Sequence, residues 1–410
     1  MNCSIAKRNI EAVTDYILAG AKKSSDNKIG IELEYFLIDT TAKKTVGYYG
    51  EHGVKWLLEE LLQFYTEKIC DITGDLIGVH SSEGYVTLEP AAQVEFSAGP
   101  FSSIDEAKEA FVCFEKNVAE ILKKAGRENF RLVNYGYNPF EKAENLSLIP
   151  KKRYEYMDAH FEKIGPWGRK MMRGSAATQI SIDFSCEQDC IRKTRIASLL
   201  VPIISIICDN TPVFEACPSK HPMMRTEIWN KCDKERCGTV PNIFDDDFSL
   251  SNYAEHVMQT SAVLVPCSLQ EWKSTEKTFS QVYKDTLMND KDIEHALSMQ
   301  FLDVRLKRFI EIRPADSMPL DAALSFAAFI KTVFYEEKCL MEIEDYLCEL
   351  VKGLNAEEAI DEAKASLMNS GLKGRIYGKS AQSVCEDVIS IALRHCSDGK
   401  DMLEQLEAKL

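Results

Sequence analysis

The sequence has no apolar run long enough to cross a membrane and no Lys/Arg-rich stripe that interrupts its acidic balance. Its most apolar stretch, residues 196–208, falls short of the ~20 apolar residues that a membrane helix needs. Acidic residues outnumber basic ones by 64 to 49, and the resulting net charge of −15 argues against binding to nucleic acid. The first residues lead into no apolar run of signal-peptide length. We therefore expect a cytoplasmic protein, a monomer or homodimer, that acts on small molecules without nucleic-acid or membrane partners.

Several well-known site motifs are also missing from the sequence. It contains no G-x-G-x-x-G and no G-x-S-x-G, and its seven histidines form no H-E-x-x-H pair. The stretch from Gly374 to Ser380 has three residues between its glycines where a Walker A loop needs four, so it predicts a turn before a helix capped by Ser380. Cys232 and Cys237 have no second ligand pair nearby, so we expect no zinc site and reduced thiols.

The order of the predicted elements favours an α+β fold. No Pro-, Gly- or Ser-rich linker divides the chain, so residues 1–410 are expected to form a single catalytic domain whose C-terminal part, from about 320 to 410, is helical. Apolar residues at helical spacing predict helices over residues 54–65, 105–125, 320–351 and, after a cap at Asn355, up to Gly371. Strand-like stretches come early and in the middle, which favours an antiparallel sheet with helices on one side.

Four strand-like stretches carry acidic, amide or guanidinium side chains at even spacing. Alternate residues of a strand lie on the same face, so each stretch can present polar groups on one face and apolar groups to a core on the other. The stretches are residues 29–35, 88–96, 178–184 and 305–313. They contain seven oxygen-bearing ligand candidates, namely Glu32, Glu34, Glu89, Gln93, Glu95, Gln179 and Glu311.

This pattern has an ordinary interpretation and a functional one. An antiparallel sheet with one solvated face also alternates apolar and polar residues. A solvated face, however, usually mixes Thr, Ser and Lys, whereas these stretches are rich in carboxylates, which repel each other unless a positive charge lies between them. Mg²⁺ takes oxygen ligands and shares its coordination with substrate phosphates, so carboxylates with nearby Arg and Lys indicate nucleotide chemistry.

Ordered blocks of the sequence resemble the plant-type glutamate–cysteine ligases, a family that also occurs in bacteria. The blocks run from about residue 28 to about 335, with a weaker echo at 371–375. They are residues 28–34; Leu88-Glu89-Pro90 with Gln93, Glu95 and Ser97; residues 168–172 and 179–185; Met224-Arg225-Thr226-Glu227-Ile228-Trp229 continuing to Asp246; and residues 304–309 with Glu311, Arg313, Ala315 and Asp316.

The resemblance implies an ATP-dependent ligase with a funnel-like curved antiparallel sheet, helices on its outer side, and the architecture of glutamine-synthetase-like carboxylate–amine ligases. Such an enzyme is expected to phosphorylate the γ-carboxylate of glutamate and to let the amine of cysteine displace phosphate. The products would be γ-glutamylcysteine, ADP and phosphate, the first step of glutathione biosynthesis. Mg²⁺ or Mn²⁺ is the implied cofactor and ATP the co-substrate.

The resemblance also assigns roles to individual residues. Metal binding is expected at Glu32, Glu34, Glu89, Glu95, Gln179 and Glu311. Arg313 and Glu311 are the expected catalytic residues, because Arg313 shares a face with Glu311 and can stabilise charge on the transferred phosphoryl group. Substrate binding is expected at Arg225, Trp229 and Gln93, with Arg225 on the α-carboxylate of glutamate, and nucleotide binding at Arg305 and Lys307.

Three stretches depart from the family pattern. Two glycines of one block are Ala91 and Ala92 here, and residues 175–179 and 313–318 also differ. These changes concern the pocket wall and leave the acceptor amine open. A ligase that joins glutamate to a different amine, an inactive nucleotide-binding relative, and a metal-dependent phosphohydrolase therefore remain alternatives.

Overall fold

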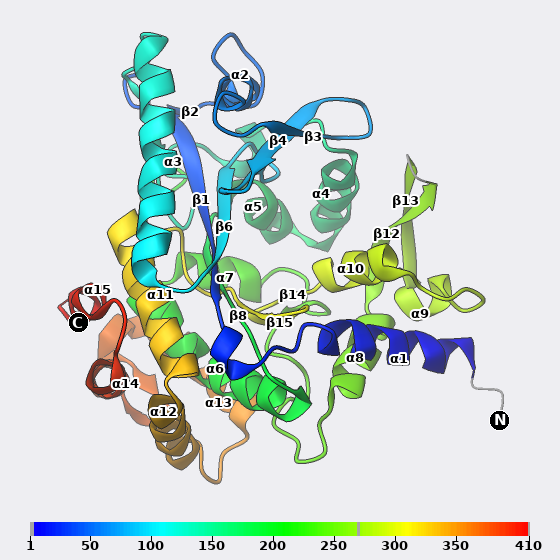
Figure 1. Ribbon diagram of the computed structural model, residues 1–410, viewed down its shortest axis with the longest axis vertical. Coiled ribbons are helices and arrows are strands. Elements are labelled where there is room, and N and C mark those ends of the chain that lie inside the picture. The colour runs from blue at the N-terminus through cyan, green and yellow to red at the C-terminus, as the bar shows by residue number, and fades with distance from the viewer. Residues whose placement is uncertain (1–3, 269–270, 409–410) are drawn as a thin grey trace.

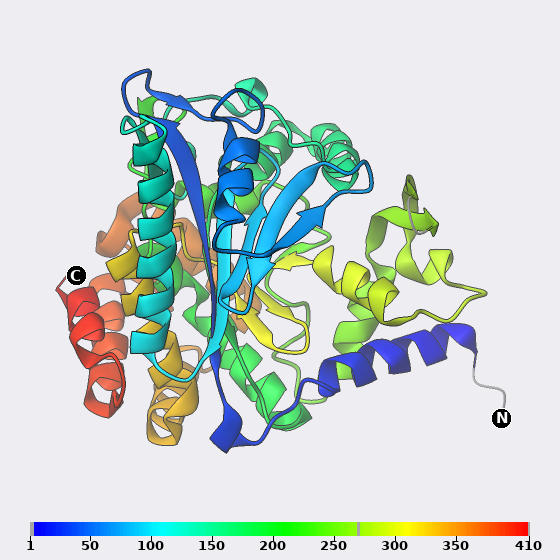
Figure 2. The ribbon, with the colours of Figure 1, turned by 45° about the horizontal axis from the view of Figure 1, so that its top comes forward.

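The computed structural model describes residues 4–268 and 271–408, and an open antiparallel sheet runs through its centre. The sheet has ten strands in the order β15-β16-β8-β1-β6-β5-β4-β3, and β2 and β7 both pair with β1. The strands are β1 Ile29–Asp39, β2 Lys44–Thr45, β3 Glu67–Cys70, β4 Leu76–Ser81, β5 Gly84–Leu88, β6 Val94–Phe101, β7 Phe130–Val133, β8 Thr178–Ile182, β15 Val304–Leu306 and β16 Ile310–Ile312. The strands fan out and the sheet is strongly twisted (Figure 2), and its edges do not meet in a closed barrel.

Two of the four stretches that were interpreted as single strands are hairpins, so that part of the prediction is wrong. Residues 88–96 end β5, make a turn and begin β6, while residues 305–313 contain β15, a turn and β16. In the first turn Pro90 has no N–H for a ladder and Ala92 adopts a left-handed φ of 66°, which breaks the strand. In the second, Lys307 N–H donates to Phe309 O at 2.9 Å and closes the reversal.

One face of the sheet is covered by helices that bury its apolar side chains. The helix α3 (Ile104–Lys124) packs on β6, α11 (Leu320–Tyr335) on β1 and β8, α2 (Val54–Leu61) on β4, and α6 (Glu187–Ile207) on β15 and β16. Figure 1 shows α3 and α11 on one side of β1 and the helices α4 (Lys152–Ile164) and α5 (Pro166–Gly174) on the other. Ile31 and Leu33 are buried in this core, while Glu32 and Glu34 alternate with them on the opposite face.

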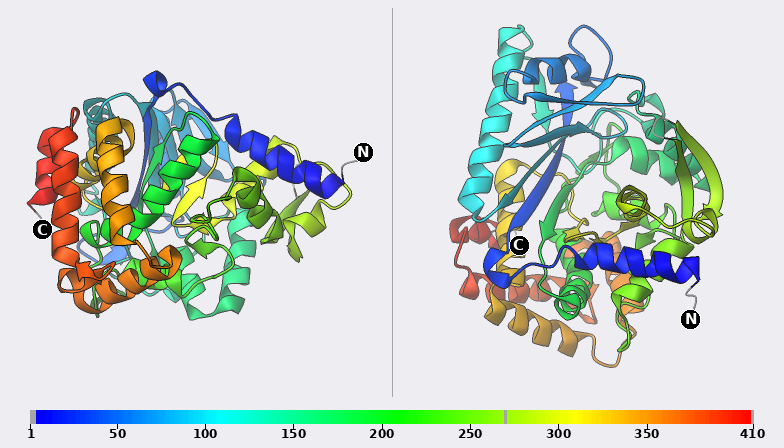
Figure 3. Two further views of the ribbon diagram at one scale, coloured as in Figure 1. Left: turned by 90° about the horizontal axis from the view of Figure 1, so that it is seen from below. Right: turned by 45° about the vertical axis from the view of Figure 1, so that its right-hand side comes forward.

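The C-terminal part from Leu320 to Glu407 is mostly helical, with short connections between the helices and one small hairpin. The predicted segment 320–351 consists of α11 and α12 (Glu337–Leu350), because Glu336 is extended and lets α12 pack against α6 and α14 (Ala381–His395). The predicted cap is confirmed, since Asn355 accepts from Glu358 N–H at the start of α13 (Ala356–Ser370). Ser380 caps α14, after the turn predicted at 374–380. Figure 3 shows these helices, with α15 (Lys400–Glu407), grouped together.

The remaining elements lie around the opposite face and at one end of the sheet, except for the small C-terminal hairpin, which packs against α13 and α14. The helix α1 (Ile5–Leu18) packs against α8 (Leu250–Gln259) and α10 (Asp290–Ser298), and α5 packs against α7 (Met224–Asn230). The other short elements are α9 Phe279–Val282 and the two-stranded pairs β9 Val213–Phe214 with β10 Cys217–Pro218, β11 Cys237–Gly238 with β14 Phe301–Leu302, β12 Ser261–Ser268 with β13 Glu271–Thr278, and β17 Arg375–Ile376 with β18 Lys379–Ser380. Within the described ranges, none of the helices has both the length and the apolar character required to span a membrane.

Candidate active site

The register of the central strands gathers carboxylates and amides on the face opposite the apolar core. Glu32 lies opposite Gln179 of β8, and Glu34 lies opposite Glu95 of β6. Directly opposed residues of an antiparallel pair share a face, so strands far apart in the sequence place these four side chains together. Gln179 Nε2 donates to Glu32 Oε2 at 3.3 Å and to Glu34 Oε1 at 3.2 Å.

The turn between β5 and β6 adds Glu89 and Gln93 to the same face. Gln93 is almost fully buried, and its Oε1 accepts from Ala91 N–H at 2.9 Å. Its Nε2 donates to Ser175 O at 2.9 Å, so Gln93 ties the turn to the segment that precedes β8. Tyr154 donates its hydroxyl to Glu89 Oε1 at 3.3 Å, which leaves Glu89 beside α4.

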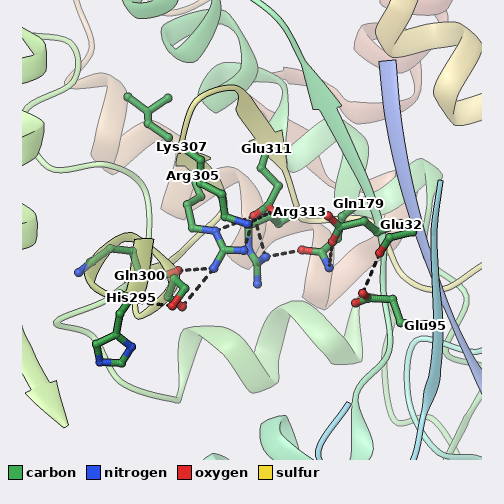
Figure 4. A network of polar contacts seen from close by, with 12 residues as sticks. Glu32, Glu95, Gln179, His295, Gln300, Arg305, Lys307, Glu311 and Arg313 are labelled. Atoms are coloured by element: carbon green, nitrogen blue, oxygen red, sulfur yellow. Dashed lines mark hydrogen bonds and ion pairs between the residues drawn. The ribbon is translucent and has the colours of Figure 1, made fainter. Parts of the chain in front are cut away.

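The hairpin of β15 and β16 holds one carboxylate among three cations. Glu311 has no exposed surface, and Arg305 Nη2 and Arg313 Nη1 contact its Oε2 at 2.6 and 2.9 Å. Lys307 Nζ contacts the other oxygen, Oε1, at 2.9 Å. Figure 4 shows the three cations converging on Glu311, while Arg313 also donates to Gln179. Because Arg305 lies directly opposite Glu311 in the register, the hairpin restores the shared face that a single strand was predicted to give.

Ten of the twelve predicted site residues line one cleft between the sheet and the helices α4, α5 and α7. The cleft has a volume of about 250 Å³. The ten residues are Glu32, Glu34, Glu89, Gln93, Glu95, Gln179, Arg225, Trp229, Arg305 and Arg313. Glu311 and Lys307 do not line it. Glu311 contacts the lining residues Arg305 and Arg313, and Lys307 contacts Glu311.

Arg225 and Trp229 reach the cleft from α7 with unpaired donors. Arg225 is buried, and its Nη1 donates to the carbonyl oxygens of Arg313 and Pro314 at 3.2 and 3.3 Å. Its Nε and the Trp229 Nε1 are buried and have no hydrogen-bond partner among residues 4–268 and 271–408. The guanidinium carbon lies 5.6 Å from the centroid of the Trp229 ring. Buried donors without partners are unfavourable, and a ligand carboxylate would satisfy them.

Four glutamates of the site, Glu32, Glu34, Glu95 and Glu311, have shifted pKa values. Burial, followed by the charges of Glu95 and Glu311, raises the pKa of Glu32 to about 7. Burial and the charges of Glu89 and Glu95 raise the pKa of Glu34 well above its usual range, and burial and Glu89 raise that of Glu95. Burial also acts to raise the pKa of Glu311, but the three surrounding cations hold it far below its usual range.

The donor set fits a hard divalent cation. In the part of the chain that the structure describes, no three His, Cys, Asp or Glu side chains are gathered closely enough to ligate one ion. After burial, the neighbouring glutamate charges are the next cause that raises the pKa values of Glu32 and Glu34, and an added cation would relieve this repulsion. Carboxylate and amide oxygens are ligands of Mg²⁺ and Mn²⁺, and Mg²⁺ keeps part of its coordination for water and phosphates.

Sequence reasoning missed the cleft residues of α4 and α5. Lys151, Arg153 and Tyr154 line the cleft at the start of α4, and Met157, Met171 and Met172 add an apolar wall. The run Lys151-Lys152-Arg153 resembles an ordinary solvated charge cluster in the sequence. Only the position of α4 across the cleft from the sheet, where it packs on α5, β12 and β13, brings two of these three cations into the site.

Comparison with known proteins finds a matching family and relatives over nearly the whole chain. The family model described as "Glutamate-cysteine ligase family 2 (GCS2)" matches residues 28–405. The chain is 28% identical over 393 residues to the chloroplastic glutamate–cysteine ligase of Arabidopsis thaliana, which covers 93% of this chain and 72% of the plant protein. It is 27% identical over 392 residues to the chloroplastic glutamate–cysteine ligase B of Oryza sativa subsp. japonica, covering 93% and 76%.

Proposed function

Because the chain belongs to glutamate–cysteine ligase family 2 and is therefore a ligase, we propose that it joins the γ-carboxylate of L-glutamate to the amine of L-cysteine with ATP. The observation that carries this proposal is that ten predicted site residues line one cleft. The products are γ-glutamylcysteine, ADP and phosphate, which makes the reaction the first step of glutathione biosynthesis. We also propose a cytosolic location. The names of the two plant relatives, in contrast, include the word chloroplastic.

The proposed reaction has two steps. An oxygen of the glutamate γ-carboxylate attacks the γ-phosphorus of ATP, ADP leaves, and γ-glutamyl phosphate forms. The cysteine nitrogen then attacks the carbonyl carbon, the C–O bond to phosphate breaks, and the amine gives up a proton. Both steps depend on positioning and on stabilising negative charge more than on covalent help from the protein.

The carboxylate face would hold the metal cofactor. We assign Mg²⁺ or Mn²⁺ binding to Glu32, Glu34, Glu89, Glu95 and Gln179, and we retain Glu311 in this set as a hypothesis. When bound, the metal ions would neutralise charge on the phosphates of ATP. Both Glu311 oxygens already contact cations, so its membership requires Lys307 or an arginine to release one of them.

Arg225 and Trp229 would bind the α-carboxylate of glutamate. The free Nε of Arg225 and the free indole N–H of Trp229 are donors in a buried part of the cleft, and an α-carboxylate accepts from both. The carbonyl oxygens of Arg313 and Pro314 fix the Arg225 guanidinium, so binding requires little reordering of that side chain. Gln93 would support this region by fixing the turn that carries Glu89.

Arg313 is the proposed catalytic cation, and Glu311 would act with it. Glu311 and Gln179 orient the Arg313 fork at the edge of the carboxylate face, where it can stabilise charge on the transferred phosphoryl group. Arg305 is oriented by the same carboxylate and would contact the nucleotide, with Lys307 fixing the other Glu311 oxygen.

A product analysis with a panel of acceptors tests the proposal. Purified protein is incubated with ATP, Mg²⁺ and glutamate, with cysteine, other amino acids, simple amines or no acceptor, and nucleotides and amides are quantified. We expect one ADP and one phosphate per γ-glutamyl amide, with cysteine preferred. AMP and pyrophosphate would contradict the acyl-phosphate route. Preference for another amine, acceptor-independent ATP hydrolysis, or binding without turnover would support one of the three alternatives instead.

A further inference from the structure

Three cations that border the cleft make no ion pair among the residues that the structure describes, and two of them, Lys151 and Arg153, are not used by the proposed mechanism. Lys151 and Arg153 lie at the start of α4 and face the carboxylate side of the sheet. Arg305 and Arg313, which also border the cleft, are both paired with Glu311. A cation that faces a partly dehydrated cleft without a carboxylate partner is a position where an anionic ligand is favoured.

Arg153 and Arg305 are anchored to the same segment at the end of α10. Arg153 Nη2 donates to Ser298 Oγ at 2.7 Å. Arg305 Nη1 donates to Gln300 O at 2.9 Å and to Ser298 O at 3.4 Å. Burial lowers the pKa of Arg153, and the nearby charge of Arg305 lowers it further. The two guanidinium groups therefore repel each other, and Glu311 compensates only Arg305.

Lys151 stands on the other side of Arg153, next to the carboxylate Glu89. Its Nζ donates to Tyr154 Oη at 3.2 Å and lies 4.3 Å from the centroid of that ring. The Tyr154 hydroxyl donates in turn to Glu89 Oε1 at 3.3 Å. Lys152 between them points elsewhere, since its Nζ pairs with Glu155 and it does not line the cleft. The start of α4 thus sends two of its three cations into the site.

We propose that Lys151 and Arg153 bind the triphosphate of ATP, and this assignment rests on the proposed ligase function. A triphosphate spans several ångströms and carries more negative charge than Arg305 can compensate while it is paired with Glu311. The Arg153 fork suits two phosphate oxygens and the Lys151 ammonium a single one. Their position opposite the sheet would clamp the phosphates between α4 and the carboxylate face, with Glu89 within reach of both Lys151 and a bound metal ion.

Calorimetric titration with a set of nucleotides tests this assignment directly. Wild-type protein and the variants Lys151→Met, Arg153→Met and Arg153→Lys are titrated, in the presence of Mg²⁺, with the β,γ-imido analogue of ATP, with adenosine and with glutamate. We expect the Kd of the ATP analogue to rise about tenfold or more for each Met variant, and less for Arg153→Lys, because each loses a charge-assisted contact. Adenosine and glutamate binding should not change. The control Lys152→Met should bind all three ligands like the wild type.

Several results of the titration would overturn the assignment. Unchanged binding of the ATP analogue by Lys151→Met and Arg153→Lys would overturn the assignment, and so would a selective loss of glutamate affinity, which would make the two cations carboxylate ligands. If Arg153→Met does not fold because its anchor to Ser298 is lost, Lys151→Met and Arg153→Lys still decide. If the wild type does not bind the ATP analogue at all, the proposed ligase function is overturned together with the assignment. If the wild type binds it and the variants bind it equally well, only the assignment of Lys151 and Arg153 is overturned.

Discussion

The site contains two kinds of glutamate, those that line the cleft and Glu311 behind it, and they differ in what surrounds them. The acidic wall, formed by Glu32, Glu34, Glu89 and Glu95, has no ion pair in the part of the chain that the structure describes, and Glu32 has a pKa raised to about 7. The clamped glutamate, Glu311, is fully buried, and its contacts with three cations keep its pKa far below its usual range.

This difference indicates two roles, metal binding and orientation of the arginines, whereas the sequence pattern alone placed all five glutamates in one metal-binding set. A carboxylate whose charge is already compensated contributes fixed geometry, since it orients the guanidinium groups of Arg305 and Arg313. Carboxylates whose charge is not compensated favour the arrival of a positive ion. The acidic wall is thus suited to bind metal, and Glu311 is suited to hold the arginines that act on the phosphates.

The largest expected effect comes from Glu311→Gln. We expect turnover to fall by about a hundredfold or more, because both arginines lose their common anchor. The free energy of unfolding should fall by about 3 kcal/mol, since removing one partner leaves buried charges without compensation. Steady-state kinetics and urea unfolding measure the two effects. The matched control is Glu337→Gln, which removes an exposed partner of Arg192 and should cost less than about 1 kcal/mol.

Titration of activity with Mg²⁺ sharpens the same comparison. If Glu311 only orients the arginines, excess Mg²⁺ should not restore the turnover of Glu311→Gln. Recovery at high Mg²⁺ would make Glu311 a metal ligand and would abolish the distinction between the two kinds of glutamate.

The second effect concerns the acidic wall. Glu32→Gln should lower turnover about a hundredfold at limiting Mg²⁺, because it removes one charge from the proposed metal set while preserving the shape of the side chain. In contrast to Glu311→Gln, part of this activity should return as the Mg²⁺ concentration rises. Near-normal turnover at limiting Mg²⁺ would remove Glu32 from the metal set.

The third effect distinguishes recognition from chemistry at the two arginines. Arg225→Ala should raise the KM for glutamate about thirtyfold with a smaller change in kcat, since an α-carboxylate contact exists in both ground and transition states. Arg313→Lys should lower kcat about tenfold, because the ammonium keeps the charge but loses the fork held by Glu311 and Gln179. The reverse pattern in steady-state kinetics would exchange the two roles.

Much of the site was predictable from the sequence, because side-chain alternation determines which residues of a strand share a face. The alternation of Glu32 and Glu34 with Ile31 and Leu33 predicted the carboxylate face, and the family resemblance added Arg225 and Trp229. The hairpins were missed, although Pro90 marks a turn, because the even spacing continues across it.

The environment of Glu311 and the role of α4 were not predictable for a different reason. Whether a buried carboxylate is compensated depends on the register between β15 and β16, which brings Arg305 opposite Glu311. Likewise, Lys151 and Arg153 enter the cleft because α4 packs on α5, β12 and β13 and so lies across the cleft from the sheet, a tertiary arrangement without a local signal.

The smallest expected effect is on the stability of the metal-free protein. A carboxyl group whose pKa is about 7 in the folded state and lower in the unfolded state binds its proton more tightly when folded. It therefore stabilises the fold at acidic pH, and this contribution is lost as the pH rises through 7. Glu32→Gln removes the ionisable group. With Mg²⁺ chelated at pH 8, the variant should be more stable than the wild type by about 1 to 2 kcal/mol.

Urea unfolding at pH 5 and pH 8, with chelator or with Mg²⁺, measures this difference. The advantage of Glu32→Gln should disappear at pH 5, where the wild-type carboxyl is protonated, and should reverse when Mg²⁺ is added, because the ion stabilises only a face that can bind it. Glu337→Gln, in an exposed ion pair, should show neither change. A variant that is less stable than the wild type in chelator at pH 8 would show that repulsion on the acidic wall is already relieved without metal, and the contrast with Glu311 would then rest on geometry alone.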